Sequence, residues 1–492
     1  MADSDGAFNN LVAHAHDAHF VIVGGGIAGL TFAYECAKVG IAVTLFEKDD
    51  ELGGTIASVE LDGVRIDTGA TSWQAKSPAM SALIAELGLQ DRVVTPARDQ
   101  VWIADPARGW AAPLPADTVL GIPANTWDES VRRVIGWGGT WRAYLDRLRP
   151  PLTIGVSRNL GALVRSRMGE KVRDRLVAPL TFGRFGIAPE DVDVDIAAPG
   201  LNAALTRTGS LGGAVSDLLV DRNREASIHS LDGGMPQLVE ALRARLVELG
   251  VVMRTGATVT AVERSQDAHW QVHVEAAEGD VRESSEVVHN ATVVVLATPE
   301  AISRDLAAQA LGRPLATARA NVHSREIVTL VLAAPALDAA AQGTEVYAVP
   351  GSSRASGIVH QTARWRWLER ETDAGRHVVS VAFDTDGDPA GVTDAELRTS
   401  AVEAASALLG VALNEAHVRG MHRARFVLDQ PKSTRDHAER RAGVRSELAE
   451  AGDLVAVGAW LSGSGLAQVV ADAVSEADRI RSAVLWGEAG GD

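Results

Sequence analysis

Cysteine is almost absent from this sequence of 492 residues, and its scarcity limits the chemistry of the chain. Because Cys36 is the single cysteine, the chain can form no intrachain disulfide and no cysteine cluster for zinc or iron–sulfur. A reducing compartment fits this composition, and we expect a cytoplasmic protein. His14, His16 and His19 are close enough in sequence to suggest a metal cluster, but histidines on a polar tail are more often solvated, so we expect no metal site.

Long apolar runs are also missing. No stretch of about 18 consecutive apolar residues occurs, so we expect no membrane-spanning helix. Residues 1–18 are a polar tail that lacks the basic and apolar regions of a secretory signal.

Positive charge is scarce overall but concentrated in one segment. The net charge of −17 disfavours nucleic acid as a partner. Residues 131–187 nevertheless contain eleven arginines and one lysine against three acidic residues, a local net charge of +9. A solvated helical surface would explain this segment, and so would a surface for a polyanionic substrate or an anionic membrane. The sequence leaves these interpretations open.

What is present indicates a globular protein of several domains. The chain is 46% hydrophobic and 23% charged, and its length predicts two or three domains. An apolar strand at 20–23, a helical pattern at 28–39 and a buried strand at 41–46 predict a β-α-β unit. Asp62-Gly63, between two short strands, predicts a tight hairpin.

The later parts of the chain alternate between strands and helices. Residues 118–226 are mostly helical, whereas 251–262 and 322–384 have strand patterns, and 454–458 is a last buried strand before a final helix. Strand-rich segments interrupted by a helical insertion predict discontinuous domains.

A glycine-rich run between the first strand and the first helix fits G-x-G-x-x-G and reads Gly24-Gly25-Gly26-Ile27-Ala28-Gly29. In this pattern the first glycine makes a tight turn, the second lets the backbone approach a pyrophosphate, and the third lets the helix pack closely on the strand. The helix N-terminus favours the phosphate charge. Glu47 follows Gly29 by 18 residues, the usual position of a carboxylate that accepts hydrogen bonds from ribose hydroxyls. The run predicts a dinucleotide site.

Four further segments follow in order and resemble those of FAD enzymes of the glutathione-reductase-2 type: Glu51-Leu52-Gly53-Gly54-Thr55, Asp67-Thr68-Gly69, 292–299 (TVVVLATP) and 454–466 (LVAVGAWLSGSGL). That group includes amine oxidases, phytoene desaturases and porphyrinogen oxidases. The resemblance implies non-covalent FAD, held by the glycine run together with Glu47, Lys48, Gly53, Gly54, Thr55, Gly69, Ala70, Thr71, Ser72, Val259, Ser464, Gly465 and Leu466.

Three more segments resemble the oxygen-dependent protoporphyrinogen and coproporphyrinogen oxidases: 231–242 (LDGGMPQLVEAL), 165–183 (RSRMGEKVRDRLVAPLTFG) and 101–123. The resemblance covers roughly residues 19–485. It implies an α/β fold, α+β overall, with a two-dinucleotide-binding-type FAD domain, a mixed β-sheet substrate domain and a helical insertion. The implied boundaries are a tail at 1–18, an FAD domain at 19–90, 228–300 and 452–488, a substrate domain at 91–117 and 301–451, and a helical domain at 118–227 on the substrate or membrane side.

Several substrate-side segments depart from the family's pattern. Its Gly-Pro-x-Ser-Phe is here Gly69-Ala70-Thr71-Ser72-Trp73, and its Gly-x-Tyr-Ala-Gly is Gly183-Arg184-Phe185-Gly186-Ile187. Its Lys-Trp-Pro is Arg364-Trp365-Arg366-Trp367, and its Pro-Gln-Tyr-x-x-Gly-His is Pro431-Lys432-Ser433-Thr434-Arg435-Asp436-His437. These departures leave the identity of the substrate open.

The family's reaction is a six-electron oxidation of a porphyrinogen. Hydride passes from a meso carbon to the flavin in three rounds, and oxygen reoxidises the flavin to give hydrogen peroxide. No protein acid or base can be named from the sequence. The substrate carboxylates, four in coproporphyrinogen and two in protoporphyrinogen, favour arginine partners. The candidate arginine partners are Arg98 and Arg364. The resemblance adds two further candidates for substrate contact, Gly183 and Trp365.

Coproporphyrinogen III is the first choice of substrate. The few lysines and many alanines indicate a GC-rich genome, and soluble family members from GC-rich Gram-positive bacteria typically take this substrate. The alternatives are protoporphyrinogen IX, another amine-oxidase-like oxidase, and a non-catalytic relative that binds FAD or porphyrin. An aromatic content of 4% gives little support to an amine substrate enclosed by aromatic rings. The implied partners are the porphyrinogen, oxygen, a ferrochelatase and the inner face of a membrane.

Overall fold

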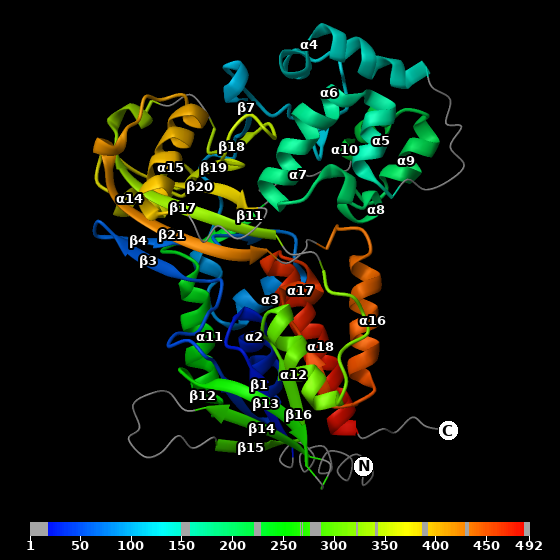
Figure 1. Cartoon of the computed structure of the whole chain (residues 1–492), viewed down its shortest axis with the longest axis vertical. Coiled ribbons are helices and arrows are strands. Elements are labelled where there is room, and N and C mark those ends of the chain that lie inside the picture. The colour runs from blue at the N-terminus through cyan, green and yellow to red at the C-terminus, as the bar shows by residue number, and fades with distance from the viewer. Residues whose placement is uncertain are drawn as a thin grey trace.

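The computed structural model describes residues 18–148, 158–220, 228–265, 267, 269–275, 287–320, 323–339, 343–385, 392–428 and 432–486. Figure 1 shows a lower part built on one sheet, an upper part built on a second sheet, and a group of helices beside the upper sheet. No helix in the described ranges is both long enough and apolar enough to cross a membrane.

A five-stranded parallel sheet forms the centre of the lower part, in the order β12-β2-β1-β16-β22. Its strands come from distant parts of the sequence: β1 (His19–Val23), β2 (Ala42–Phe46), β12 (Val252–Arg254), β16 (Val293–Leu296) and β22 (Leu454–Ala456). The predicted β-α-β unit is therefore confirmed as β1, α2 (Ile27–Ala37) and β2.

Side chains that alternate along β1 supply two different cores. Phe20 and Ile22 belong to the cluster formed with α2, α11 (Pro236–Glu248) and α18 (Leu466–Trp486). Val21 and Val23 belong to the cluster on the opposite face, which includes a three-stranded sheet of β13 (Thr258–Arg264), β14 (Trp270–Glu275) and β15 (Val287–Ala291). The sheet is thus covered on both faces, as a parallel sheet requires.

Two predictions from the sequence differ from the structure near the five-stranded sheet. The strand pattern at 251–262 divides between β12 and β13, which lie in different sheets, because the chain turns between them at Gly256 (φ 63°). His14 and His16 lie outside the described residues, but His19 belongs to β1 and not to the tail. Its ring nitrogens lie 2.9 Å from the Asn290 carbonyl oxygen and 2.9 Å from the Thr44 hydroxyl, so it is part of the sheet.

A seven-stranded mixed sheet forms the upper part, in the order β21-β17-β20-β19-β18-β7-β8. Only β18 and β7 are parallel neighbours among these described strands. The strands are β7 (Val101–Asp105), β8 (Trp110–Pro113), β17 (His323–Ala333), β18 (Glu345–Ala348), β19 (Gly357–His360), β20 (Arg376–Thr385) and β21 (Val418–Leu428). Helix α15 (Asp394–Leu409) packs on the sheet, and α13 (Gln361–Arg364) and α14 (Arg366–Glu371) interrupt the strand pattern expected for 322–384.

The helical group has its own apolar core. It contains α4 (Glu129–Tyr144), α5 (Leu160–Met168), α6 (Glu170–Val172), α7 (Ala178–Phe185), α8 (Val194–Ala197), α9 (Leu201–Thr208) and α10 (Leu211–Val220). Helix α4 lies at the outer edge of the group in Figure 1. Isolated bridges and backbone hydrogen bonds join this group to the segment before α16 (His437–Ala449), since Asp193 N–H donates to the Ser433 carbonyl oxygen at 2.7 Å.

The remaining elements are short or peripheral. The predicted hairpin is confirmed: Asp62 (φ 50°) and Gly63 (φ 77°) connect β3 (Ser58–Leu61) and β4 (Val64–Asp67) in a left-handed turn that suits paired strands. The others are β5 (Trp73–Gln74), β6 (Val93–Val94), β9 (Thr118–Val119), β10 (Ile122–Pro123), β11 (Ile228–Leu231), α3 (Pro78–Glu86), α12 (Glu300–Leu311) and α17 (Ala459–Ser462). The mixed α/β fold class is confirmed, whereas the exact domain boundaries stay a prediction.

Candidate functional site

The glycine run forms the turn from β1 into α2. Gly24 has φ 109°, and a Cβ there would lie 2.5 Å from the Ala297 carbonyl oxygen, so only glycine makes this turn without strain. A Cβ on Gly29 would lie 2.0 Å from the Gly24 carbonyl oxygen, because the helix packs closely on the turn. A Cβ on Gly26 would meet nothing within 4 Å. Gly26 therefore faces open space at the start of the helix.

The first turn of α2 fits an anionic group. The helix starts at Ile27 with no side-chain cap and with no acidic residue in its first turn. Free N–H groups and the helix dipole at such an end favour an anion. The open space over Gly26 leaves the backbone accessible from that side. Both observations fit the pyrophosphate of a dinucleotide.

Glu47 lies beside this turn at the end of β2. Its Oε2 accepts a hydrogen bond from Gly25 N–H at 2.7 Å, and its Oε1 accepts one from Asp49 N–H at 2.9 Å. The structure thus holds the buried carboxylate next to the glycine run. The ammonium group of the adjacent Lys48 is exposed and pairs with Asp49 at 2.7 Å.

Two loops extend the site from the turn. Gly53 N–H donates to the Gly25 carbonyl oxygen at 2.9 Å, and a Cβ on Gly54 would lie 3.2 Å from the Gly26 Cα. The second loop contacts the first, because Ala70 N–H donates to the Thr55 carbonyl oxygen at 2.8 Å. The loops at 53–55 and 69–72 therefore form one continuous surface with the glycine run.

The last predicted cofactor segments come from far along the chain. Leu466 begins α18 and shares an apolar cluster with Ile27 and Ala28 of α2, which brings Ser464 and Gly465 to this side of the molecule. Val259 of β13 shares the cluster on the opposite face of the sheet with Val23. The tertiary structure therefore gathers most of the predicted residues around the start of α2, and their contact with the cofactor stays a prediction.

A cavity of ≈ 180 Å³ lies where the loop at 67–71 meets α7 and the seven-stranded sheet. Its volume is below the range of about 300–1,000 Å³ that is usual for ligand sites, so a large ligand would extend beyond it. The lining residues are Asp67, Thr68, Gly69, Thr71, Gly183, Arg184, Arg325, Ile327, Tyr347, Gly357, Ile358, Val359, Gln361, Ser380 and Ala382.

Asp67 lies on the loop side of the cavity. Its Oδ2 accepts a hydrogen bond from Met235 N–H at 2.9 Å, which ties the loop to the start of α11. Burial raises the pKa of Asp67 to about 6, although the Met235 hydrogen bond and Arg65 oppose this effect. The carboxyl group therefore titrates close to neutral pH, and groups with such shifts gather at functional sites.

Arg325, on the sheet side, donates a hydrogen bond from each of its three guanidinium nitrogens. Its Nε donates to Asp384 Oδ1 at 2.6 Å, and its two terminal nitrogens donate to the Gly183 carbonyl oxygen at 3.0 Å and the Phe182 carbonyl oxygen at 2.7 Å. It fixes the C-terminal turn of α7 against β17. A cation at this end also complements the helix dipole.

Behind the cavity lies a buried group of charged and polar side chains. Arg364 pairs with Glu345, and the Tyr347 hydroxyl donates to Glu345 Oε2 at 2.8 Å. Burial opposes the charged form of Glu345, but Arg364 and then Arg184 outweigh it and lower the pKa of that carboxyl. Burial and the nearby Glu345 raise the pKa of Tyr347, so its hydroxyl keeps its proton and donates.

Of the predicted substrate residues, only Gly183 lines this cavity. A Cβ on Gly183 would lie 2.3 Å from Tyr347 Cδ1, so glycine permits α7 to approach β18. Arg364 is buried against Glu345, and Trp365 is 2% exposed in a separate apolar cluster. Arg98 is exposed and also lies outside the cavity lining. The structure therefore does not place Arg98, Arg364 or Trp365 at this cavity.

Several residues of the cavity lining on the sheet side were not predicted from the sequence, above all Arg325, Tyr347, Gln361 and Ser380. They lie on strands or just after them, where alternating apolar and polar residues predict a strand but do not identify a site. Arg325 precedes the apolar part of β17, and a charged residue inside a long strand was the one signal that could have identified it.

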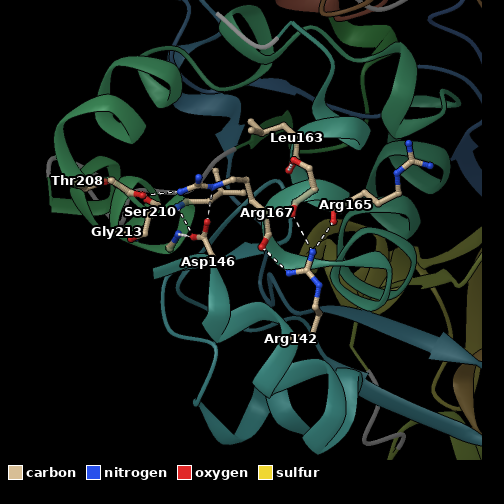
Figure 2. Close-up of polar contacts among 12 residues, drawn as sticks. Arg142, Asp146, Leu163, Arg165, Arg167, Thr208, Ser210 and Gly213 are labelled. Carbon is tan, nitrogen blue, oxygen red and sulfur yellow. Dashed lines mark hydrogen bonds and ion pairs between the residues drawn. The ribbon is translucent and has the colours of Figure 1, made fainter. Parts of the chain in front are cut away.

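The basic segment 131–187 is partly internal. Figure 2 shows Arg142 reaching the backbone at the C-terminal end of α5, where it donates to the carbonyl oxygens of Arg167 and Ser166, each at 2.9 Å. Arg167 is buried and pairs with Asp146 Oδ1 at 2.5 Å. Not every arginine of the segment therefore belongs to a surface, because Arg142 and Arg167 hold the helices together.

Other residues of this segment are exposed on α4 and the turn after it. The exposed fractions are 62% for Trp137, 56% for Trp141 and 70% for Leu148. The Arg132 guanidinium lies 4.6 Å from the centre of the Trp137 ring. This aromatic and basic surface is defined here as the α4 patch.

The chain is similar in sequence and in fold to several known proteins. The chain is 28% identical over 506 residues to a coproporphyrinogen III oxidase of Propionibacterium freudenreichii, covering 96% of this chain and 92% of that protein. It is 29% identical over 465 residues to a coproporphyrinogen III oxidase of Mycobacterium tuberculosis, covering 91% and 94%. A crystal structure from Exiguobacterium sp. 255-15 shares the fold, with a TM-score of 0.79 at 22% identity and coverage of 95% and 99%.

The match that decides the family spans most of the chain. Residues 27–481 match the family described as flavin containing amine oxidoreductase, from the first residue of α2 into α18. The range includes the seven-stranded sheet, the helical group, the loops at 53–55 and 69–72, and the strands of the five-stranded sheet other than β1. This chain therefore belongs to the flavin-containing amine oxidoreductases, and its cofactor is FAD.

Proposed function

We propose that this chain oxidises coproporphyrinogen III to coproporphyrin III by removing six electrons, with oxygen as the acceptor and hydrogen peroxide as the product. The carrying observation is the cavity that joins the loop at 67–71 to Arg184 and Arg325. Arginines at one end of the cavity, near the proposed position of the redox cofactor, suit a substrate with an electron-rich ring and carboxylate arms. The near-full-length similarity to two coproporphyrinogen III oxidases supports this choice of substrate.

When bound, FAD accepts the electrons of each two-electron step. We infer that it is held without a covalent bond: Cys36 is buried inside α2, and burial raises the pKa of its thiol, which makes it unreactive. The residues proposed to hold it are those predicted from the sequence, with the pyrophosphate at the run from Gly24 to Gly29 and the ribose at Glu47. The loops at 53–55 and 69–72 extend this surface toward the cavity.

The chain's own residues position the substrate in this proposal. Arg325 holds the end of α7, Gly183 lets that end approach β18, and Asp67 ties the loop to Met235. Ile327, Ile358 and other sheet residues line the cavity on the sheet side. Six electrons leave the macrocycle in three steps of two electrons each.

Two other functions have specific support. The family description covers amine oxidoreductases, so an amine substrate is one alternative. A non-catalytic FAD or porphyrin carrier is the other, because the segment at 183–187 and the segment at 431–437 depart from the family's pattern. Protoporphyrinogen IX is the nearest competing substrate within the proposed reaction.

The test compares oxidation of freshly reduced coproporphyrinogen III and protoporphyrinogen IX by the FAD-loaded protein. Porphyrin fluorescence, oxygen consumption and hydrogen peroxide are followed together, with heat-denatured protein as the control for spontaneous oxidation. We expect faster formation of coproporphyrin III, with three molecules of oxygen consumed per porphyrin formed. A faster reaction with protoporphyrinogen IX would change the substrate, and binding without oxidation of either would make the chain a carrier.

We propose that the protein is cytoplasmic and that the α4 patch contacts an anionic membrane surface. Exposed tryptophans beside arginines are typical of segments that lie at a lipid interface. Helix α4, which carries the patch, lies at the outer edge of the helical group and far from the parallel sheet (Figure 1). A transient contact with a ferrochelatase, which would receive the porphyrin, stays a prediction.

Liposome flotation tests the membrane contact. Replacing Trp137 and Trp141 together by alanine should release the protein from vesicles that contain phosphatidylglycerol, whereas vesicles of phosphatidylcholine alone should bind neither form. Trp486 is a matched control, since it is 62% exposed but lies at the end of α18. Equal flotation of the double variant and the wild type would leave the patch as a solvated surface.

A further inference from the structure

Arg184 differs from the other arginines at the cavity. Arg325 lines the cavity but uses its donors on Asp384 and on two carbonyl oxygens of α7. Arg364 lies behind the cavity and is paired with Glu345. Arg184 lines the cavity and is exposed, and it forms no hydrogen bond or ion pair with another residue that the structure describes. Its guanidinium is therefore the available cation of this cavity.

The backbone position of Arg184 is fixed by contacts of neighbouring residues and not by contacts of its own side chain. It lies in the last turn of α7, whose end is held by Arg325 through the Phe182 and Gly183 carbonyl oxygens. Gly183 permits α7 to lie against Tyr347, and Gly186 ends the helix in a left-handed conformation (φ 69°). The backbone that carries Arg184 is thus set by contacts on both sides.

The charges around Arg184 leave it positive. Glu345 is close enough to interact with it, but that carboxylate is already paired with Arg364 and bonded by Tyr347. Asp99 also interacts with Arg184, but Asp99 is exposed, and exposed pairs are weak. The protein as a whole carries a net charge of −17, so an anionic ligand needs a local cation to approach this cavity.

We propose that Arg184 binds a carboxylate arm of the substrate and makes affinity for this cavity depend on the substrate's acid groups. The inference rests on the proposed porphyrinogen oxidation. A guanidinium with free donors binds a carboxylate through two parallel hydrogen bonds, which fixes orientation as well as charge. Because the cavity is small, the arm enters it while much of the macrocycle remains outside.

The test measures the affinity of FAD-loaded protein for coproporphyrin III and for its tetramethyl ester by tryptophan-fluorescence quenching in one detergent-containing buffer. The variants are Arg184→Gln, Arg184→Lys and the control Arg165→Gln. Arg165 is exposed on α5 and away from the cavity lining, so its loss changes net charge equally. We expect Arg184→Gln to weaken binding of the tetra-acid about 10-fold or more, with unchanged affinity for the ester. Arg184→Lys should retain part of the affinity.

Each other outcome overturns the inference in a recognisable way. Wild-type affinity for the tetra-acid in Arg184→Gln would show that Arg184 does not bind a carboxylate, and it would leave the proposed reaction intact. Equal losses for the acid and the ester would indicate structural damage, which the FAD content and the flavin absorption spectrum check independently. An equal loss in Arg165→Gln would assign the effect to overall charge. If the wild type neither binds nor oxidises a porphyrin, the proposed function fails together with the inference.

Discussion

The starts of helices α10 and α2 differ in whether the chain itself supplies a negative charge to the free backbone N–H groups. At the start of α10, the Asp146 carboxylate accepts from Leu211 N–H at 2.5 Å and from Gly212 N–H at 3.3 Å (Figure 2). At the start of α2 there is no acidic residue and no capping side chain, and Gly26 faces open space.

Both helix starts favour an anion near their free amides. At α10 the anion stabilises the fold, whereas at α2 we propose that it belongs to a bound ligand. Free amides at a helix start favour an anion. In α10 that anion belongs to the chain and is balanced by Arg167, so the site is closed and stabilises the helical group. In α2 we propose that the anion comes from the cofactor. A helix start without a cap is therefore a better indication of a ligand than a helix start alone.

The largest effect is expected from removing the internal anion. Asp146→Ala leaves Arg167 buried without its partner and two amides unbonded, so the free energy of unfolding should fall by about 3–5 kcal/mol. Urea unfolding of the FAD-loaded protein measures it. Asp174→Ala is the control, because that carboxylate is 49% exposed and pairs with Arg173. A loss below about 1 kcal/mol would contradict a structural role for the Asp146 pair.

Next in size is the effect of closing the open helix start. Gly26→Leu places a side chain where the pyrophosphate is proposed to lie, and FAD affinity should fall more than about 100-fold. The fold should tolerate the change, since a Cβ there meets no atom within 4 Å. Flavin absorbance of the purified protein and circular dichroism separate the two effects. Gly138→Leu, on exposed α4, is the control, and yellow Gly26→Leu protein would place the pyrophosphate elsewhere.

A smaller loss is expected at the ribose side of the same turn. Glu47→Ala removes the carboxylate that accepts from Gly25 N–H, and we expect FAD affinity to fall about 10- to 100-fold. Titration of the apoprotein with FAD measures the change, and Glu51→Ala serves as an exposed control. An unchanged affinity in folded Glu47→Ala would remove this carboxylate from the cofactor site.

The last effect concerns the cavity and vanishes at low pH. The pKa of Asp67 is raised to about 6 by burial, so the folded state holds the proton more tightly than the unfolded state. The stability that this proton provides is complete below the ordinary aspartate pKa of about 4 and is lost as the pH rises through about 6. Asp67→Asn should therefore match the wild type near pH 4 and exceed its stability by up to about 3 kcal/mol at pH 7, since one pKa unit corresponds to about 1.4 kcal/mol. A difference that does not vary with pH would refute the raised pKa.

Particular residues show which features of the fold and the site could be predicted from the sequence. Gly24, Gly29, Asp62 and Gly63 take the backbone geometry that their spacing predicted, because a tight turn depends on neighbours in sequence. Cavity residues such as Tyr347 were not found, because they come from separate strands with no local signal. Arg364 and Trp365 were candidates from resemblance, but their side chains pack in the interior.

The sequence by itself therefore determined the dinucleotide turn, the fold class and the membership of a flavin enzyme family, since these depend on short segments with strong local preferences. Only the tertiary structure decided which charges are free. Arg167 and Arg325 are engaged by partners far along the chain, whereas Arg184 is left facing the cavity. The physical reason is that a charge is neutralised by whatever lies within a few ångströms of it, and that neighbour is chosen by the fold and not by the order of residues.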